Sequence, residues 1–190
     1  MDNLLKMTYI LGKNLGQTIT MRQLSKEAGV PYTTARRTIN SNSSIIITEE
    51  KGSSILCKLN TQHPLIRSYL ALSERNAADD FCRKNKEISV IKSELPRASR
   101  AVVLFGSRAS GKERVKSDID LLVINNDGKK DISFSKQEML FKLEINSLFM
   151  TGKEFKLMLN EEDHNLGHEI MRNHIILQGE EYFWSVALGV

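Results

Sequence analysis

The 190-residue sequence has no apolar run long enough to cross a membrane. Its apolar stretches are only a few residues long, whereas a membrane helix needs about 20. The first residues, MDNLLKM, also lack the basic segment followed by an apolar stretch that marks a secretion signal. We therefore expect a cytoplasmic protein with no membrane partner.

Cysteine is scarce as well. Cys57 and Cys82 are far apart in the sequence and lack the spacing of a metal site. We expect both to be reduced thiols, because disulfides are rare in the cytoplasm. The chain has no internal repeat and no low-complexity stretch, and its 41% apolar and 26% charged residues are typical of a globular protein.

Charge is distributed unevenly along the chain. The net charge of +4 arises wholly within residues 1–60, which hold 8 basic and 4 acidic residues, whereas the remainder holds 19 of each. Such asymmetry favours two domains, of which the first faces a polyanion.

Residues 1–60 are predicted to form helices followed by a hairpin. Thr20 is a suitable N-cap for the second helix, Gly29 ends that helix, and Pro31 suits the start of the third. The predicted elements are helices over 4–15, 22–28 and 31–40 and strands over 45–48 and 54–59, joined by a turn over 49–52.

This order of elements resembles the winged helix-turn-helix of small transcription regulators. The resemblance implies that the third helix recognises DNA, and a pair of such modules on two half-sites implies a homodimer. The alternative is a module used for protein contact or dimerisation. The side chains expected to contact phosphates or base edges are Tyr32, Thr33, Thr34, Arg36, Arg37 and Asn40.

Residues 61–97 are predicted to be linker helices, because apolar residues recur there at helical spacing up to Pro96. They could pair with a second copy of the chain or pack on their own domain. Residues 98–190 then contain apolar runs of strand length at 101–105, 119–124 and 143–149, with further helices and a short strand at 175–177.

A Gly-Ser pair and two aspartates are expected to form a site on these strands. Gly106 and Ser107 follow the first strand, and Asp118 and Asp120 begin the second. Residues two apart on a strand face the same side, and two adjacent carboxylates repel each other unless a cation lies between them. Mg²⁺ is commonly bound by carboxylates together with substrate phosphates. Glycine lets the backbone approach those phosphates closely.

Glu144 is the candidate for a third acid. It lies between Leu143 and Ile145, which should face the core, so that its carboxylate projects to the other side with the two aspartates. Glu138 is the alternative. The competing interpretation, surface carboxylates without function, is disfavoured by the joint pattern. Four basic residues lie between the two halves of the site and could face phosphate: Arg108, Lys112, Arg114 and Lys116.

The segment LFGSRASGKERVKSDIDLLVI resembles the nucleotidyltransferase superfamily that includes DNA polymerase beta, and is most similar to its minimal nucleotidyltransferase branch. The resemblance covers about residues 98–185. It implies that Gly106, Ser107 and Arg108 bind the nucleotide. It also implies that Asp118, Asp120 and Glu144 are the catalytic residues and hold two Mg²⁺ or Mn²⁺ ions.

The implied fold is α+β, with a winged helix-turn-helix at 1–60, linker helices at 61–97 and a mixed sheet packed by helices in a nucleotidyltransferase domain at 98–190. His164, His168 and His174 are expected to have surface or packing roles.

The implied reaction moves a nucleoside monophosphate from an NTP, expected to be ATP, to an acceptor such as a partner protein. The alternative is a transcription regulator or antitoxin whose transferase-like domain senses nucleotide or binds a partner. The intact acids favour the enzyme. No residue identifies the base or the acceptor.

Overall fold

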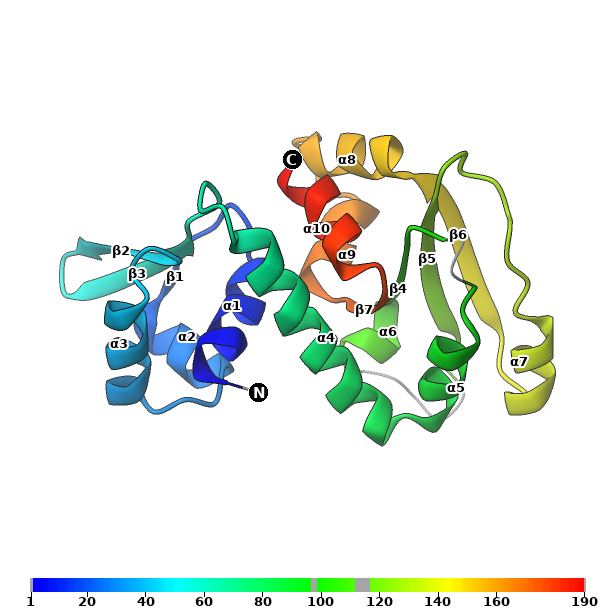
Figure 1. Ribbon diagram of the computed structural model, residues 1–190, viewed down its shortest axis with the longest axis horizontal. Coiled ribbons are helices and arrows are strands. Elements are labelled where there is room, and N and C mark those ends of the chain that lie inside the picture. The colour runs from blue at the N-terminus through cyan, green and yellow to red at the C-terminus, as the bar shows by residue number, and fades with distance from the viewer. Residues whose placement is uncertain (1, 97–98, 112–116, 190) are drawn as a thin grey trace. The chain divides into compact units, whose positions relative to one another are not determined.

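The chain divides into two compact units, Met1–Ser73 and Glu74–Val190, in the computed structural model (Figure 1). The structure describes residues 2–96, 99–111 and 117–189. The division falls within helix α4 (Ile66–Lys84), which contributes to both units. No helix among the described residues is long and apolar enough to span a membrane.

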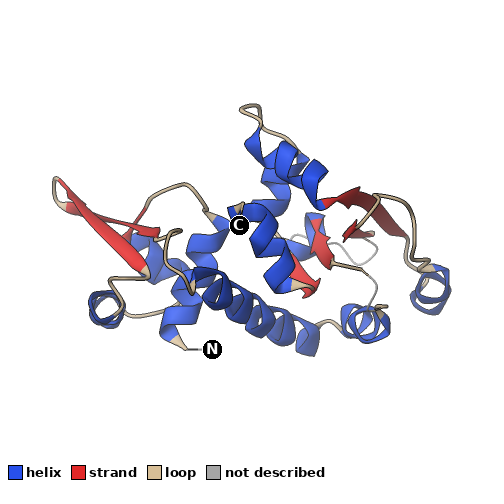
Figure 2. Ribbon diagram, turned by 45° about the horizontal axis from the view of Figure 1, so that its top comes forward, coloured by secondary structure: helices blue, strands red, loops and turns tan. Residues whose placement is uncertain are grey.

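Besides the first part of α4, the described residues of the first unit form three helices and a small antiparallel sheet. The strand order is β1-β3-β2, so the two-residue strand β1 pairs with the hairpin that follows the helices. This hairpin, red in Figure 2, extends beyond the helices. In chain order the elements are α1 (Asn3–Lys13), β1 (Ile19–Thr20), α2 (Met21–Glu27), α3 (Tyr32–Ser41), β2 (Ile46–Lys51) and β3 (Ser54–Leu59).

The turn between α2 and α3 is fixed by local hydrogen bonds. Thr20 is the N-cap of α2, as predicted, because its hydroxyl oxygen accepts a hydrogen bond from the Gln23 backbone N–H at 3.1 Å. After α2, Gly29 adopts a positive φ of 60°, and the Ser25 hydroxyl donates to the Val30 carbonyl at 2.7 Å. The Gly29 conformation and the Ser25–Val30 hydrogen bond thus fix the turn between α2 and α3.

The hairpin turn is shorter than the sequence predicts. Glu49, Glu50 and Lys51 were expected in the turn, but they continue β2 and pair with β3 as far as Lys51 opposite Ser54. Charged residues are compatible with a strand here, because β2 is exposed along most of its length. The prediction of a turn over 49–52 is therefore wrong in its first residues.

The second unit is an α+β domain with a mixed sheet, which confirms that part of the predicted fold class. The strand order is β6-β5-β4-β7; β5 and β6 are parallel, and β4 is antiparallel to both of its neighbours. After α4, the elements are α5 (Lys86–Glu94), β4 (Ala101–Phe105), α6 (Gly106–Ala109), β5 (Ile119–Asn125), α7 (Ser135–Phe141), β6 (Ile145–Thr151), α8 (Gly152–Asn160), α9 (Leu166–Arg172), β7 (Ile175–Gln178) and α10 (Glu180–Leu188).

Both faces of the central strands are buried. On β5, Ile119, Leu121 and Val123 belong to a core cluster that also contains Ile88 and Ile91 of α5. The alternate residues of β5, Leu122 and Ile124, are also fully buried. Burial on both faces explains the nearly continuous apolar runs of β4 and β5.

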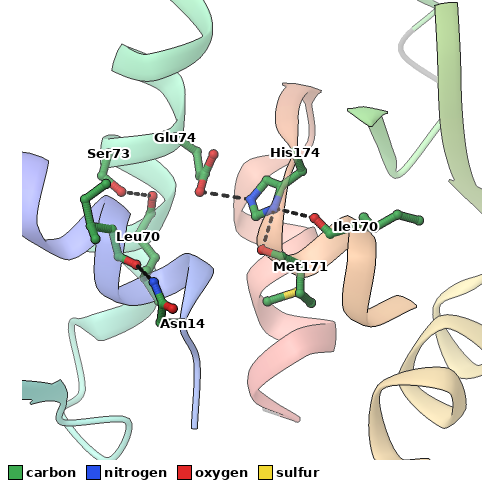
Figure 3. Close-up of polar contacts among 8 residues, drawn as sticks. Asn14, Leu70, Ser73, Glu74, Ile170, Met171 and His174 are labelled. Carbon is green, nitrogen blue, oxygen red and sulfur yellow. Dashed lines mark hydrogen bonds and ion pairs between the residues drawn. The ribbon is translucent and has the colours of Figure 1, made fainter. Parts of the chain in front are cut away.

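A buried polar pair lies between α4 and the residue before β7 (Figure 3). The side chains of Glu74 and His174 are both fully buried, with Glu74 Oε1 3.1 Å from His174 Nε2. The other ring nitrogen, Nδ1, lies 2.8 Å from the Ile170 carbonyl and 3.0 Å from the Met171 carbonyl. Carbonyls only accept, so Nδ1 carries a proton, and one further proton lies between Nε2 and the carboxyl group. His174 thus has a packing role, as expected, and joins the end of α9 to α4.

We expect Glu74→Ala to lower the free energy of unfolding of the second unit by about 3–5 kcal/mol, because it leaves a buried polar partner uncompensated. Glu74→Gln keeps a hydrogen-bond donor for Nε2 and should cost much less. Urea unfolding followed by circular dichroism measures both variants. Glu162→Ala is the control, because Glu162 is exposed. Equal stability of the alanine variant and the wild type would contradict this role for the pair.

Candidate active site

Antiparallel pairing of β4 with β5 brings the Gly-Ser turn to the aspartates. Phe105, the last residue of β4, lies opposite Asp120, the second residue of β5. The chain leaves β4 directly into α6 at Gly106. The turn and the carboxylates, separated by ten residues of sequence, therefore meet at one edge of the sheet.

Gly106 is required at this position for two reasons. Its backbone φ of 73° is one that residues other than glycine rarely adopt. A Cβ placed on it would also overlap the Asp120 carboxylate, with Oδ2 the nearest atom. The Asp120 carboxylate therefore lies directly against the backbone of the glycine turn.

Asp118 and Glu144 each directly precede one of the two parallel strands, β5 and β6. Asp118 is exposed and precedes β5, while Asp120 is half-buried. Glu144 precedes β6, is exposed, and its carbonyl accepts a hydrogen bond from the Ile119 N–H at 2.9 Å. As predicted, Leu143 and Ile145 pack with the core on either side of it. The role of Glu144 as third acid remains a prediction.

Asn146 is a site residue that the sequence reasoning missed. It pairs with Asp120 in the parallel register of β5 and β6, and its amide nitrogen lies 3.5 Å from Asp120 Oδ1. The Asp120 carboxylate is thus bordered by Asn146 on one oxygen and by Gly106 on the other. The available signal was the position of Asn146 two residues after Glu144, on the same face of the strand.

Glu138, the alternative third acid, contacts the backbone. Its Oε1 accepts a hydrogen bond from the Ile145 N–H at 3.1 Å, which fixes the start of β6. Between them, Lys142 ends α7 in the left-handed conformation with a φ of 54°. Glu138 therefore shapes the strand on which Asn146 lies.

Arg108 joins α6 to the residue before Asp118. Its side chain is buried, and Nε donates to the Ser117 carbonyl at 2.9 Å. This bond ties α6 to the residue just before Asp118. The other basic residues expected near phosphate, Lys112, Arg114 and Lys116, lie outside the described residues.

The donors at this edge of the sheet suit a hard cation. Asp118, Asp120 and Asn146 offer carboxylate and amide oxygens, the ligand type that Mg²⁺ prefers. In the described part of the chain, no group of three or more His, Cys, Asp or Glu side chains is placed to hold a metal ion. Carboxylate and amide oxygens suit an ion that takes one or two protein carboxylates and completes its coordination with phosphates and water.

The cysteines are unsuited to nucleophilic chemistry. Burial raises the pKa of the Cys57 thiol to about 11, and burial also raises the pKa of Cys82. Both thiols are free and protonated at neutral pH, so the polar groups around Gly106 are the stronger functional candidates.

The mixed sheet packed by helices is consistent with a nucleotidyltransferase-like fold. A family model described as "Polymerase beta, Nucleotidyltransferase" matches residues 80–182. The chain therefore belongs to this family of nucleotidyltransferases. The match begins within α4, so it includes the buried residue Ile88 of α5 and the whole mixed sheet. No curated protein and no solved structure matched the chain.

Alanine substitutions at two glycines, Gly106 at the start of α6 and Gly111 just after its end, distinguish a steric clash with Asp120 from backbone strain. Gly106 and Gly111 both have positive φ, but a Cβ at Gly111 meets nothing within 4 Å. Each alanine variant should lose about 1–2 kcal/mol of stability because alanine is strained in the left-handed conformation, whereas only Gly106→Ala displaces the Asp120 carboxylate. We therefore expect Gly106→Ala to lose Mg²⁺-dependent NTP binding in calorimetry and Gly111→Ala to retain it. Similar binding by both variants would refute the close approach as a functional requirement.

Proposed function

We propose that the second unit transfers a nucleoside monophosphate from an NTP to an acceptor, with release of pyrophosphate, in a Mg²⁺- or Mn²⁺-dependent reaction. The observation that carries this proposal is the contact between Gly106 and the Asp120 carboxylate. It places a backbone that a phosphate can approach next to a carboxylate oxygen that can bind a divalent cation. Membership of the nucleotidyltransferase family supports the same chemistry.

The phosphate-facing part of the site is the turn after β4. Gly106 has no side chain to obstruct an approaching phosphate, and the Ser107 hydroxyl is available as a hydrogen-bond donor. Arg108 points instead to the Ser117 carbonyl. We therefore assign Gly106 and Ser107 to nucleotide binding and Arg108 to positioning of Ser117, the residue before Asp118.

The acidic part of the site holds the metal and the acceptor. Asp118 and Asp120 would bind two Mg²⁺ ions together with the phosphates, and the bound ions would neutralise charge on the α-phosphate and the leaving group. Asn146 orients Asp120 from the neighbouring strand. The exposed Glu144 carboxylate would accept the proton of the attacking hydroxyl as the bond from acceptor oxygen to α-phosphorus forms and the bond to pyrophosphate breaks.

The acceptor and the base remain open in this proposal. ATP is the expected donor, and a partner protein is one candidate acceptor, as in an antitoxin that modifies its partner. A nucleotide-sensing regulator without catalysis is the competing function. It would bind NTP but transfer nothing.

We expect Asp120→Asn to reduce transfer of label from α-³²P-NTP to acceptors in cell extract by about a hundredfold or more, since it removes charge from an electrostatic site. Asp131→Asn, which changes an exposed aspartate outside the residues assigned to the site, should leave transfer unchanged. Absence of transfer by the wild type, with NTP binding intact, would favour the sensor.

We further propose that the first unit binds DNA through α3. Ala35 and Ile39 of this helix are buried, whereas the residues predicted to recognise DNA lie on its exposed or half-exposed side: Tyr32, Thr33, Thr34, Arg36, Arg37 and Asn40. The helices α2 and α3 followed by the β2–β3 hairpin support a winged helix-turn-helix interpretation. The exposed acids Glu49 and Glu50 on β2 favour α3 over the hairpin as the main contact. We expect a homodimer to bind two half-sites.

We expect Arg36→Ala/Arg37→Ala to weaken binding to DNA from upstream of the coding sequence and to reduce the slope of log affinity against log salt by about 2, if each arginine contacts one phosphate. Lys153→Ala/Lys156→Ala on α8 removes the same charge from two exposed positions of the second unit. Fluorescence anisotropy at several salt concentrations measures the slope. Equal slopes for the two double variants would reject α3 as the DNA-binding surface.

A further inference from the structure

A polar hollow adjoins the glycine turn on the side of α9. Its volume is about 330 Å³, within the range of roughly 300–1,000 Å³ typical of small-molecule sites. Phe105, whose opposite neighbour is Asp120, also contributes to its lining. The residues that give the hollow its polar character and its contact with the turn are Gly106, Ser110, His164, Glu169, Arg172 and Asn173.

We propose that this hollow binds the nucleoside part, the base and ribose, of the NTP whose phosphates meet Gly106 and Asp120. The inference rests on the proposed transferase function. Gly106 is shared between the hollow and the contact with the Asp120 carboxylate. A nucleotide with its phosphates at the turn therefore has a recess for its remaining part within reach.

The charge of the lining favours a nucleoside over a second phosphate group. Arg172 brings one positive charge and Glu169 one negative charge, which leaves no excess of positive charge for a polyphosphate. Asn173 has an amide that both donates and accepts, Glu169 accepts, and Ser110 and His164 do either. Such a mixture matches the hydroxyls of ribose and the polar edge of a base.

The wall formed by α9 is held in place by hydrogen bonds. At its start, the Asn165 side chain caps the helix by accepting from the His168 N–H at 3.2 Å, and the His168 ring nitrogen Nε2 lies 3.2 Å from the Leu159 carbonyl. At its end, Asn173 directly precedes His174, which is joined to Glu74 in the interior. Arg172 and Asn173 therefore project from a fixed element, and a fixed wall suits discrimination between ligands.

The test compares NTPs with a ligand that has phosphates but no nucleoside. Calorimetry with Mg²⁺ measures binding of ATP, CTP, GTP, UTP and inorganic tripolyphosphate to the wild-type chain and to Glu169→Gln/Asn173→Ala. The loss of one or two hydrogen bonds should weaken the preferred NTP about tenfold and change its preference over the other three, while tripolyphosphate affinity changes less than about twofold. Asn160→Ala/Glu162→Gln is the matched control, because both residues are exposed and lie outside the hollow.

Each other outcome overturns the inference in a distinct way. Equal weakening of NTP and tripolyphosphate would assign the hollow to phosphate, and no weakening of either would exclude the hollow while leaving the transferase proposal intact. Reduced label transfer with unchanged NTP affinity would assign the hollow to the acceptor. A wild-type chain that binds no NTP would defeat the transferase proposal, and this inference with it.

Discussion

The contact between the Gly106 backbone and the Asp120 carboxylate is the constraint on which the site depends. It exists because β4 and β5 are antiparallel neighbours with Phe105 opposite Asp120. A shift of one residue would turn the Asp120 carboxylate toward the core cluster that contains Ile119 and Leu121, so the packing of β5 favours this register. The packing of the hydrophobic core and the geometry of the site therefore depend on the same pairing of β4 with β5. A substitution in the core that shifts this pairing would also move the Asp120 carboxylate.

Local patterns in the sequence were sufficient for most of the elements. Thr20 as a cap, the apolar strands at 101–105 and 119–124, and the outward position of Glu144 all follow from short-range periodicity and capping chemistry. The sequence placed the hairpin turn too early because charged residues are found both in turns and on exposed strands, so they do not distinguish the two. Glu49 and Glu50 occupy such a strand.

Contacts between distant segments could not be predicted from the sequence. Asn146 is recognisable as a neighbour of Asp120 only once the parallel register of β5 and β6 is known. The hydrogen bond from Arg108 to the Ser117 carbonyl likewise joins residues nine positions apart and has no local signature. The pairing of Glu74 with His174 across 100 positions has no local signature at all. In each case tertiary packing decides which of several possible partners a polar side chain meets.

The order of strands along the chain also affects how the protein folds during synthesis. The sheet of the first unit uses only residues 19–59, so all of its strands have been made before translation reaches the second unit at Glu74. In the second unit, by contrast, β4 pairs with β7, the last strand, and His174 emerges just before it. The apolar edge of β4 therefore stays uncovered until nearly the whole chain has been made, and it is the segment most in need of protection from aggregation while translation continues.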